Sequence, residues 1–115
     1  MRLLDTGAVI DLLRQRAYEP GSITAITLID VLRGTPEEKR AGVKDLLEES
    51  FDLLSLDNDT VLAYCTLYQA LKDRGESILD ADLLIAAAAI SRGIPLKTGD
   101  QHFERLKEFG LVTTN

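Results

Sequence analysis

The sequence predicts an α/β fold of three layers, in which a central, mainly parallel sheet of four to five strands lies between helices. The main observation is alternation: short apolar, β-branched segments alternate along the chain with longer segments whose apolar residues recur at helical spacing. Such alternation is typical of a parallel sheet covered on both faces. The second observation is size and composition. A chain of 115 residues, with 45% hydrophobic and 28% charged residues, suits one domain, which we expect to span residues 1–115.

Each element in the first half has a local signal at one of its ends. Thr6 is a good N-cap for the first helix, and Pro20 and Gly21 break the chain before the second strand. Gly34 ends the second helix, and Pro36 stands in the favoured first turn of the third. The expected elements, in order, are a strand over 2–4, a helix over 6–14, a strand over 22–25, helices over 26–32 and 37–49, and a strand over 51–56.

The second half continues the same pattern. Gly75 and Gly93 end two helices, and Asp80 is the expected N-cap of the second of them. The expected elements, in order, are a long helix from Asp57 or Asn58 to Arg74, a helix over 81–92, a strand over 94–97, a helix from Asp100 to Phe109, and an edge strand over 111–113.

Charge and cysteine content exclude several classes of protein. The net charge of −6 gives no global attraction to nucleic acid, so any phosphate-bearing substrate would need local basic residues or metal ions. Cys65 is the single cysteine, which excludes an internal disulfide and suits a cytoplasmic location. The longest apolar run, Leu83 to Ile90, is too short to span a bilayer, so we expect no membrane partner.

Four aspartates lie beside the apolar segments. Asp5 and Asp100 directly follow the first and fourth predicted strands, whereas Asp30 and Asp82 lie on neighbouring helices. A carboxylate beside a core is unfavourable unless it is paired, hydrogen bonded or bound to metal. In open α/β sheets the working site lies at the carboxyl ends of the strands. We therefore expect the four acids to share one pocket, which would hold a cation that prefers oxygen ligands.

Each acid also has a purely structural interpretation. Asp5 and Asp100 could cap helices, where the helix dipole favours negative charge. Asp30 could pair with Arg33, three residues further along its helix. Asp80 and Asp82 face different sides of their helix, so we assign Asp80 to the cap and Asp82 to the site. No single aspartate is specific, and the prediction rests on the four together.

Three segments, in this order, carry a family resemblance: LLDTGAVID, ITAITLIDVLRG and LDADLLIAAAAISRGIPLKTGDQHFERL. They resemble PIN-domain proteins, and among these the toxin ribonucleases of the VapC type. The resemblance implies an endoribonuclease that uses Mg²⁺ or Mn²⁺ to activate water for attack on a phosphodiester. Its catalytic acids correspond to Asp5, Asp30, Asp82 and Asp100, its metal ligands to Asp5, Asp82 and Asp100, and its supporting hydroxyls to Thr6 and Thr98. It further implies an RNA substrate, a homodimer, and an antitoxin that places a basic side chain in the acidic pocket.

The chain departs from the family pattern at three places. Asp30 stands where the family usually has glutamate, so its carboxylate reaches about one methylene less far. The connection from the first helix to the second strand is short, which reduces one wall of the cleft. His102 occupies a position where the family often has an acid, and we interpret it as a surface residue. A catalytically impaired PIN fold that acts as a binding module is therefore an alternative function.

Other residues have less specific interpretations. Arg14, Arg16, Arg33 and Arg74 are candidates for phosphate binding, although each is more typical of a solvated charge. Tyr64 and Tyr68 recur at helical spacing and suit packing or a subunit interface. A third function, a receiver-type signalling domain phosphorylated on Asp57, fits the alternation of elements and Lys97. It lacks the paired acids after the first strand, and it gives Asp30 and Asp82 no role.

Overall fold

Five short strands, all parallel, form one sheet in the order β3-β2-β1-β4-β5. The computed structural model describes residues 1–115. Its elements are β1 (Leu3–Leu4), α1 (Thr6–Gln15), β2 (Ser22–Thr24), α2 (Ala25–Arg33), α3 (Glu37–Ser50), β3 (Asp52–Leu54), α4 (Asn58–Asp73), α5 (Asp80–Arg92), β4 (Leu96–Lys97), the 3₁₀ helix η1 (Gln101–Phe109) and β5 (Thr113–Thr114). The predicted α/β class, the parallel sheet and the edge position of the last strand are confirmed.

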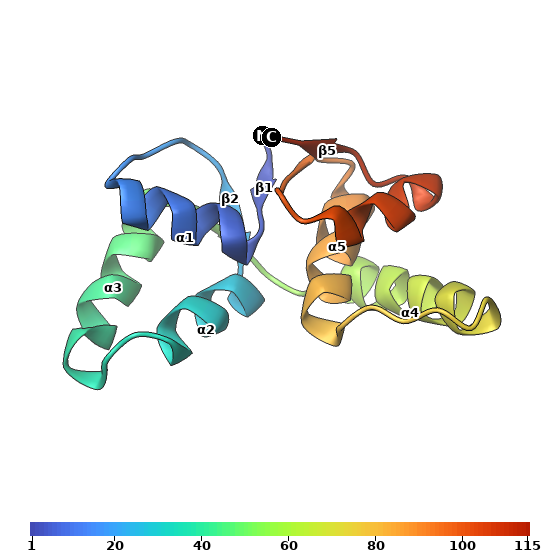
Figure 1. The fold of residues 1–115 in the computed structure, drawn as a ribbon, viewed down its shortest axis with the longest axis horizontal. Coiled ribbons are helices and arrows are strands. Elements are labelled where there is room, and N and C mark those ends of the chain that lie inside the picture. Colours follow the sequence, from blue (N-terminus) through green and yellow to red (C-terminus); the bar gives the residue numbers. More distant parts are fainter.

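The central strand divides the core into two halves. Successive residues of a strand point to opposite faces, and in β1 Leu3 packs with α4, α5 and η1 whereas Leu4 packs with α1, α2 and α3. Both leucines are fully buried. Figure 1 shows the two groups of helices on opposite sides of the strands. The three-layer arrangement thus follows from two adjacent leucines, each of which packs in a different hydrophobic cluster.

Helix α5 is the most buried helix of the fold. Its residues Ala86 to Ala89 are all 0% exposed, and the small side chains let the helix pack closely against α4 in the same core cluster as Leu3 and Leu96 of the sheet. The apolar run therefore packs in the core, as its composition predicts. Because the helix is packed in this way, its first turn, which carries Asp82, is held at the edge of the sheet. None of the helices has the length and apolar character needed to cross a bilayer.

Two predicted helix caps are wrong by one residue. Asp5, not Thr6, is the N-cap of α1, because its carboxylate accepts from the N–H of Ala8. Leu79, not Asp80, precedes α5, and Asp80 is the first helical residue. The carboxylate of Asp80 instead accepts a hydrogen bond from the hydroxyl of Tyr64 at 2.6 Å, which raises the pKa of Tyr64 to about 12.

Two elements near the C-terminus also differ from the prediction. The segment after Asp100 is a 3₁₀ helix rather than an α-helix; it buries Phe103 and Leu106, half-buries Phe109, and exposes its remaining residues. The last strand covers Thr113–Thr114 rather than 111–113, because the backbone of β5 pairs with Leu96 and Lys97 at those positions. Neither difference moves Asp100, which directly precedes η1.

Candidate active site

Asp5 lies at the carboxyl end of β1 and is almost fully buried, with 6% of its surface exposed. Its Oδ1 accepts a hydrogen bond from the backbone N–H of Ala8 at 2.8 Å, and its Oδ2 accepts one from the hydroxyl of Thr98. Its own backbone N–H donates to the carbonyl of Lys97 at the end of β4. These hydrogen bonds offset the free-energy cost of burying a charge. They also fix the carboxylate at the junction of the two central strands.

Thr98 connects Asp5 to Asp100. The hydroxyl of Thr98 donates to Asp5 and accepts a hydrogen bond from the backbone N–H of Asp100 at 3.0 Å. Asp100 in turn caps η1, since its Oδ1 accepts from the N–H of His102 at 2.9 Å. The two acids predicted at strand ends are therefore held together by one buried threonine. His102 is exposed, as the sequence predicts.

The surroundings of Asp82 disfavour its negative charge. It lies half-buried in the first turn of α5. Burial raises the pKa of Asp82 most, and the negative charges of Asp100, Asp5 and Asp30 raise it further, in that order. Only the charge of His102 acts in the opposite direction and lowers the pKa. The charge effect of three acids on the fourth indicates that all four predicted aspartates lie in one electrostatic neighbourhood.

Asp30 lies at the margin of this group. Its Oδ2 accepts a hydrogen bond from the hydroxyl of Thr6 at 2.9 Å, and its Oδ1 forms an ion pair with Arg33 at 3.1 Å. The structural interpretation of Asp30, a partner for Arg33, is thus present in the structure, together with a contact to the predicted supporting residue Thr6. The hydroxyl of Thr6 therefore orients Asp30, and the hydroxyl of Thr98 orients Asp5.

A cavity of about 550 Å³ lies at this edge of the sheet. Asp5, Thr6, Asp82 and Asp100 all line it. Asp30 is not among its lining residues, and Thr98 lies behind Asp5, where it lines a neighbouring cavity of about 230 Å³. Segments from residues 5, 82 and 100 therefore meet at one open cavity, at the carboxyl ends of β1 and β4, where open α/β sheets place their working sites.

Two residues of the cavity were not assigned to the acidic site from the sequence. Asp11 and Arg14 of α1 line the cavity together with Gly7. Residues 7, 11 and 14 are four and three apart, so they share one face of the helix. This spacing could have identified them, because the intervening apolar residues Val9, Leu12 and Leu13 face the other side and line a different cavity.

The donor set suits an oxygen-preferring cation. The cavity offers the carboxylates of Asp5, Asp11, Asp82 and Asp100 and no histidine or thiol, which is the ligand chemistry of Mg²⁺ and Mn²⁺ rather than of zinc. No group of three or more such side chains is close enough together to hold an ion directly. Mg²⁺ usually keeps several waters and binds through one or two carboxylates. The acids of this cavity are compatible with that mode of binding.

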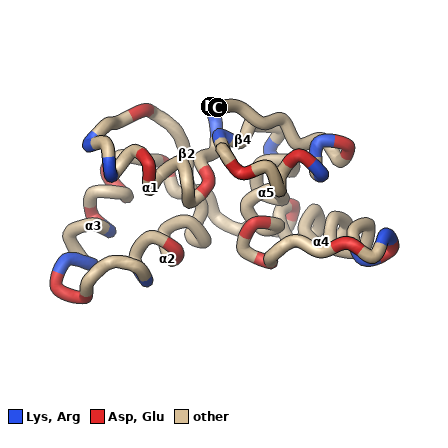
Figure 2. The backbone as a smooth tube through the Cα atoms, in the orientation of Figure 1, with Lys and Arg blue, Asp and Glu red and all other residues tan.

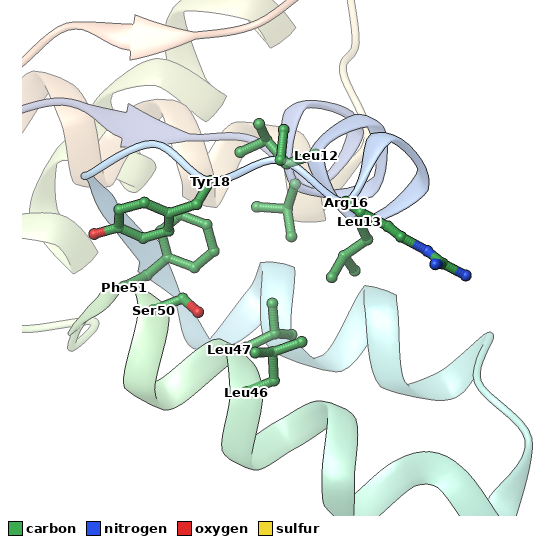
Figure 3. Close-up of a pocket in the computed structure, with 10 residues that line it drawn as sticks. Leu12, Leu13, Arg16, Tyr18, Leu46, Leu47, Ser50 and Phe51 are labelled. Carbon is green, nitrogen blue, oxygen red and sulfur yellow. The ribbon is translucent and has the colours of Figure 1, made fainter.

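A second cavity, of about 270 Å³, is apolar and lies between α1 and α3. Figure 3 shows Leu12 and Leu13 of α1 opposite Leu46 and Leu47 of α3, with the rings of Tyr18 and Phe51 beside each other at one end. The two ring centroids are 6.3 Å apart. This cavity contains no acid, so it offers a surface for apolar contacts and no site for the chemistry considered above.

Asp57, the acid of the receiver-type alternative, lies outside the acidic cavity. It is the N-cap of α4, and its Oδ1 accepts hydrogen bonds from the backbone and hydroxyl of Thr60. These bonds and the charge of Arg92 hold the pKa of Asp57 below its usual value. A helix cap satisfied in this way explains Asp57 without a signalling role.

Comparisons with known proteins agree with this architecture. The family model of the PIN domain matches residues 2–108. Ribonuclease VapC1 of Methanocaldococcus jannaschii is 40% identical over 113 residues, which cover 95% of this chain and 83% of that protein. Among solved structures, VapBC-1 from nontypeable Haemophilus influenzae has the same fold, with a TM-score of 0.85, 24% identity, and coverage of 99% of this chain and 96% of that one.

A second solved structure is a member of the VapBC family of toxin-antitoxin systems, VapBC-5 from Mycobacterium tuberculosis. It is 28% identical with a TM-score of 0.70, and the match covers 97% of this chain and 94% of that one. The sequence resemblance is therefore confirmed by the family model, by a relative and by the fold. The chain belongs to the PIN-domain family, and among the members of that family it is similar to VapC proteins.

Proposed function

We propose that this protein is a metal-dependent endoribonuclease, the toxin component of a type II toxin–antitoxin system. The observation that supports it most is the convergence of Asp5, Asp82 and Asp100, from three separate segments, on one cavity. The similarity to Ribonuclease VapC1 of Methanocaldococcus jannaschii supports RNA as the substrate. We propose that the protein acts on RNA in the cytoplasm.

The proposed catalytic residues are Asp5, Asp82, Asp100 and, less directly, Asp30. Asp5, Asp82 and Asp100 would hold Mg²⁺ or Mn²⁺, one or two of them directly and the rest through water molecules. The ion, when bound, lowers the pKa of a water molecule and stabilises the charge that develops on a phosphoryl group. Thr98 orients Asp5, and Thr6 orients Asp30. A bound cation would lower the raised pKa of Asp82, because its positive charge would offset the negative charges of the neighbouring acids.

The direct test is cleavage of single-stranded RNA with and without added Mg²⁺ or Mn²⁺. We expect the wild-type protein to cleave, Asp82→Asn to lose cleavage, and Asp57→Asn to keep it. Asp57→Asn is the matched control, since it makes the same chemical change at an acid outside the cavity and asparagine is also a good N-cap. Equal activity of Asp82→Asn and wild type would contradict the proposal.

A second candidate function is a PIN fold that binds nucleic acid without cutting it. Two observations favour it. No three acids are close enough to hold an ion directly. In addition, the carboxylate of Asp30 is turned toward Thr6 and Arg33. A protein that binds RNA in a metal-independent manner and leaves it intact would support this candidate over the nuclease.

The proposed protein partner is an antitoxin. This proposal is supported by the similarity to the VapBC structures and by the acidic cavity, which could accept a basic side chain of the partner. We expect wild-type expression to arrest growth of a bacterial host, and co-expression of the antitoxin, sought in the neighbouring reading frame, to relieve the arrest. Growth arrest that persists in Asp82→Asn would contradict a toxin that acts through this site.

We also propose that the protein forms a homodimer. Apolar side chains of α4 are exposed, namely Val61, Leu62 and Tyr68, and Leu79, just before α5, is 77% exposed. The ring of Tyr68 stacks on Tyr64, with centroids 6.1 Å apart. Light scattering on the purified protein tests the proposal, and a monomeric mass at all concentrations would contradict it.

A further inference from the structure

The acidic cavity is lined by a single cation, Arg14. It lies in the last turn of α1, on the helix face that also carries Gly7 and Asp11, and its side chain is exposed to solvent. Asp11 stands three residues before it, yet the two side chains form no ion pair. The guanidinium of Arg14 therefore lies at an opening lined by carboxylates while making no strong contact of its own.

Most of the other basic side chains already have carboxylate partners. Ion pairs join Arg2 and Lys97 to Glu19, Arg33 to Asp30, Lys44 to Glu48, Arg74 to Glu108, Arg92 to Asp57, Arg105 to Glu76, and Lys107 to Glu104. The basic residues without an ion pair are Arg14, Arg16, Lys39, Arg40 and Lys72. Of these only Arg14 lines the acidic cavity, and Arg16 lines the apolar one.

A phosphodiester strand that approaches this cavity meets strong repulsion. The chain has a net charge of −6, and four aspartates line the cavity. Figure 2 shows basic and acidic positions interspersed along the chain rather than gathered into a basic stripe. Attraction of the strand must therefore come from local positive charge, which a bound cation and a basic side chain of the chain can supply. A guanidinium suits this role because its fixed fork of donors can bind two phosphate oxygens at once.

We propose that Arg14 binds a phosphate group of the RNA strand at the rim of the acidic cavity and so positions the neighbouring phosphodiester against Asp5 and Asp82. This inference rests on the proposed nuclease function and adds a substrate-binding residue to it. The role belongs to binding rather than to the chemical step, so loss of Arg14 affects the affinity for RNA more than the turnover of bound RNA.

The test compares Arg14→Gln, Arg14→Lys and the control Lys39→Gln in cleavage of single-stranded RNA with Mg²⁺. For Arg14→Gln we expect KM to rise roughly tenfold, as for loss of a hydrogen-bonded charge, with little change in kcat. The logarithmic salt dependence of RNA binding should weaken by about 0.7 for one lost contact to single-stranded nucleic acid. Arg14→Lys should keep the salt dependence and recover part of the KM. Lys39→Gln removes one positive charge from an exposed residue of α3 that lines neither cavity, and it should behave as wild type.

Binding is also measured by fluorescence anisotropy in the Asp82→Asn background, so that affinity is obtained without cleavage. If the wild type cleaves RNA while Arg14→Gln keeps the wild-type KM and salt dependence, the phosphate role is overturned and the nuclease function stands. Equal losses in Arg14→Gln and Lys39→Gln would overturn it too, because they would indicate a general charge effect. If the wild type neither binds nor cleaves RNA, the nuclease function fails, and the role of Arg14 fails with it.

Discussion

The hydroxyl of Thr98 donates a hydrogen bond to the carboxylate of Asp5, across 93 residues of the chain. The same oxygen accepts the backbone N–H of Asp100. Thr98 and Asp5 are both buried, and they lie at the ends of the adjacent strands β4 and β1. One side chain thus determines how two candidate metal ligands are placed relative to each other.

Replacing Thr98 with valine should reduce both stability and activity. The variant leaves an oxygen of a buried carboxylate without its donor, and we expect a loss of roughly 1–3 kcal/mol in the free energy of unfolding. RNA cleavage should fall about 10- to 100-fold, as for other residues that orient a metal ligand. Urea denaturation and the cleavage assay measure the two effects, and Thr98→Ser, which keeps the hydroxyl, should restore most of each.

Thr24 offers a matched control. Its hydroxyl is fully buried and has no hydrogen-bond partner, so Thr24→Val removes a polar group that contributes nothing and should be neutral or stabilising. If Thr98→Val changes the free energy of unfolding and the rate of RNA cleavage as little as Thr24→Val does, the contact between Thr98 and Asp5 contributes to neither stability nor activity.

Sequence alone could predict the residues that follow directly from a strand. Asp5 and Asp100 come just after β1 and β4, and adjacent parallel strands bring their carboxyl ends together, so their meeting needs only the correct strand order. Asp82 could also be predicted, because the buried alanines of α5 leave one orientation for the start of the helix. These placements depend on the order of apolar and polar residues along the chain, which is visible in the sequence.

The remaining details depend on contacts between distant residues. Whether Asp30 points to the cavity or to Arg33 is decided by the rotation of α2 and by the hydroxyl of Thr6. Asp11 was given no role from the sequence, and the packing of α1 places it at the cavity. The helix cap was misassigned to Asp80 because the hydroxyl of Tyr64, sixteen residues away, binds its carboxylate instead.

Asp82→Asn should abolish activity and stabilise the metal-free protein at neutral pH. RNA cleavage should fall roughly 100-fold or more, since the variant removes a carboxylate from the reacting centre. The pKa of Asp82 is raised in the folded state, so its ionisation opposes folding at neutral pH. Because Asp82 is half-exposed and screened by solvent, we expect a gain of less than about 1 kcal/mol.

The pH dependence of that gain gives a further check. A raised folded pKa contributes stability that is present below the unfolded pKa and is lost as pH rises through the folded pKa. The stabilisation by Asp82→Asn should therefore appear at neutral pH and vanish below pH 3.8, the ordinary pKa of an aspartate. Thermal unfolding in a chelating buffer at both pH values measures it. If Asp82→Asn is less stable than wild type at neutral pH, the inference that ionisation of Asp82 opposes folding is wrong.

Mg²⁺ or Mn²⁺ should raise the melting temperature of the wild-type protein. A cation that binds only the folded state adds about 1.4 kcal/mol of stability at a concentration tenfold above its Kd. Removing the carboxylate of Asp82 should reduce the shift, because it removes one of the charges that attract the ion. The control is Asp57→Asn, whose shift should equal that of the wild type. No shift with either ion would count against a shared metal site.

Asp30 should contribute to activity less than Asp82 does. It is not among the residues that line the cavity, and both of its oxygens have partners, the hydroxyl of Thr6 and the guanidinium of Arg33. We expect Asp30→Asn to lower kcat/KM roughly tenfold, as for a residue that acts through its neighbours. Asp30→Glu, which reaches one methylene further toward the cavity, should keep or increase activity. Full activity of Asp30→Asn would make Asp30 a purely structural partner of Arg33, whereas a loss as large as that of Asp82→Asn would require Asp30 to act directly on the metal or water.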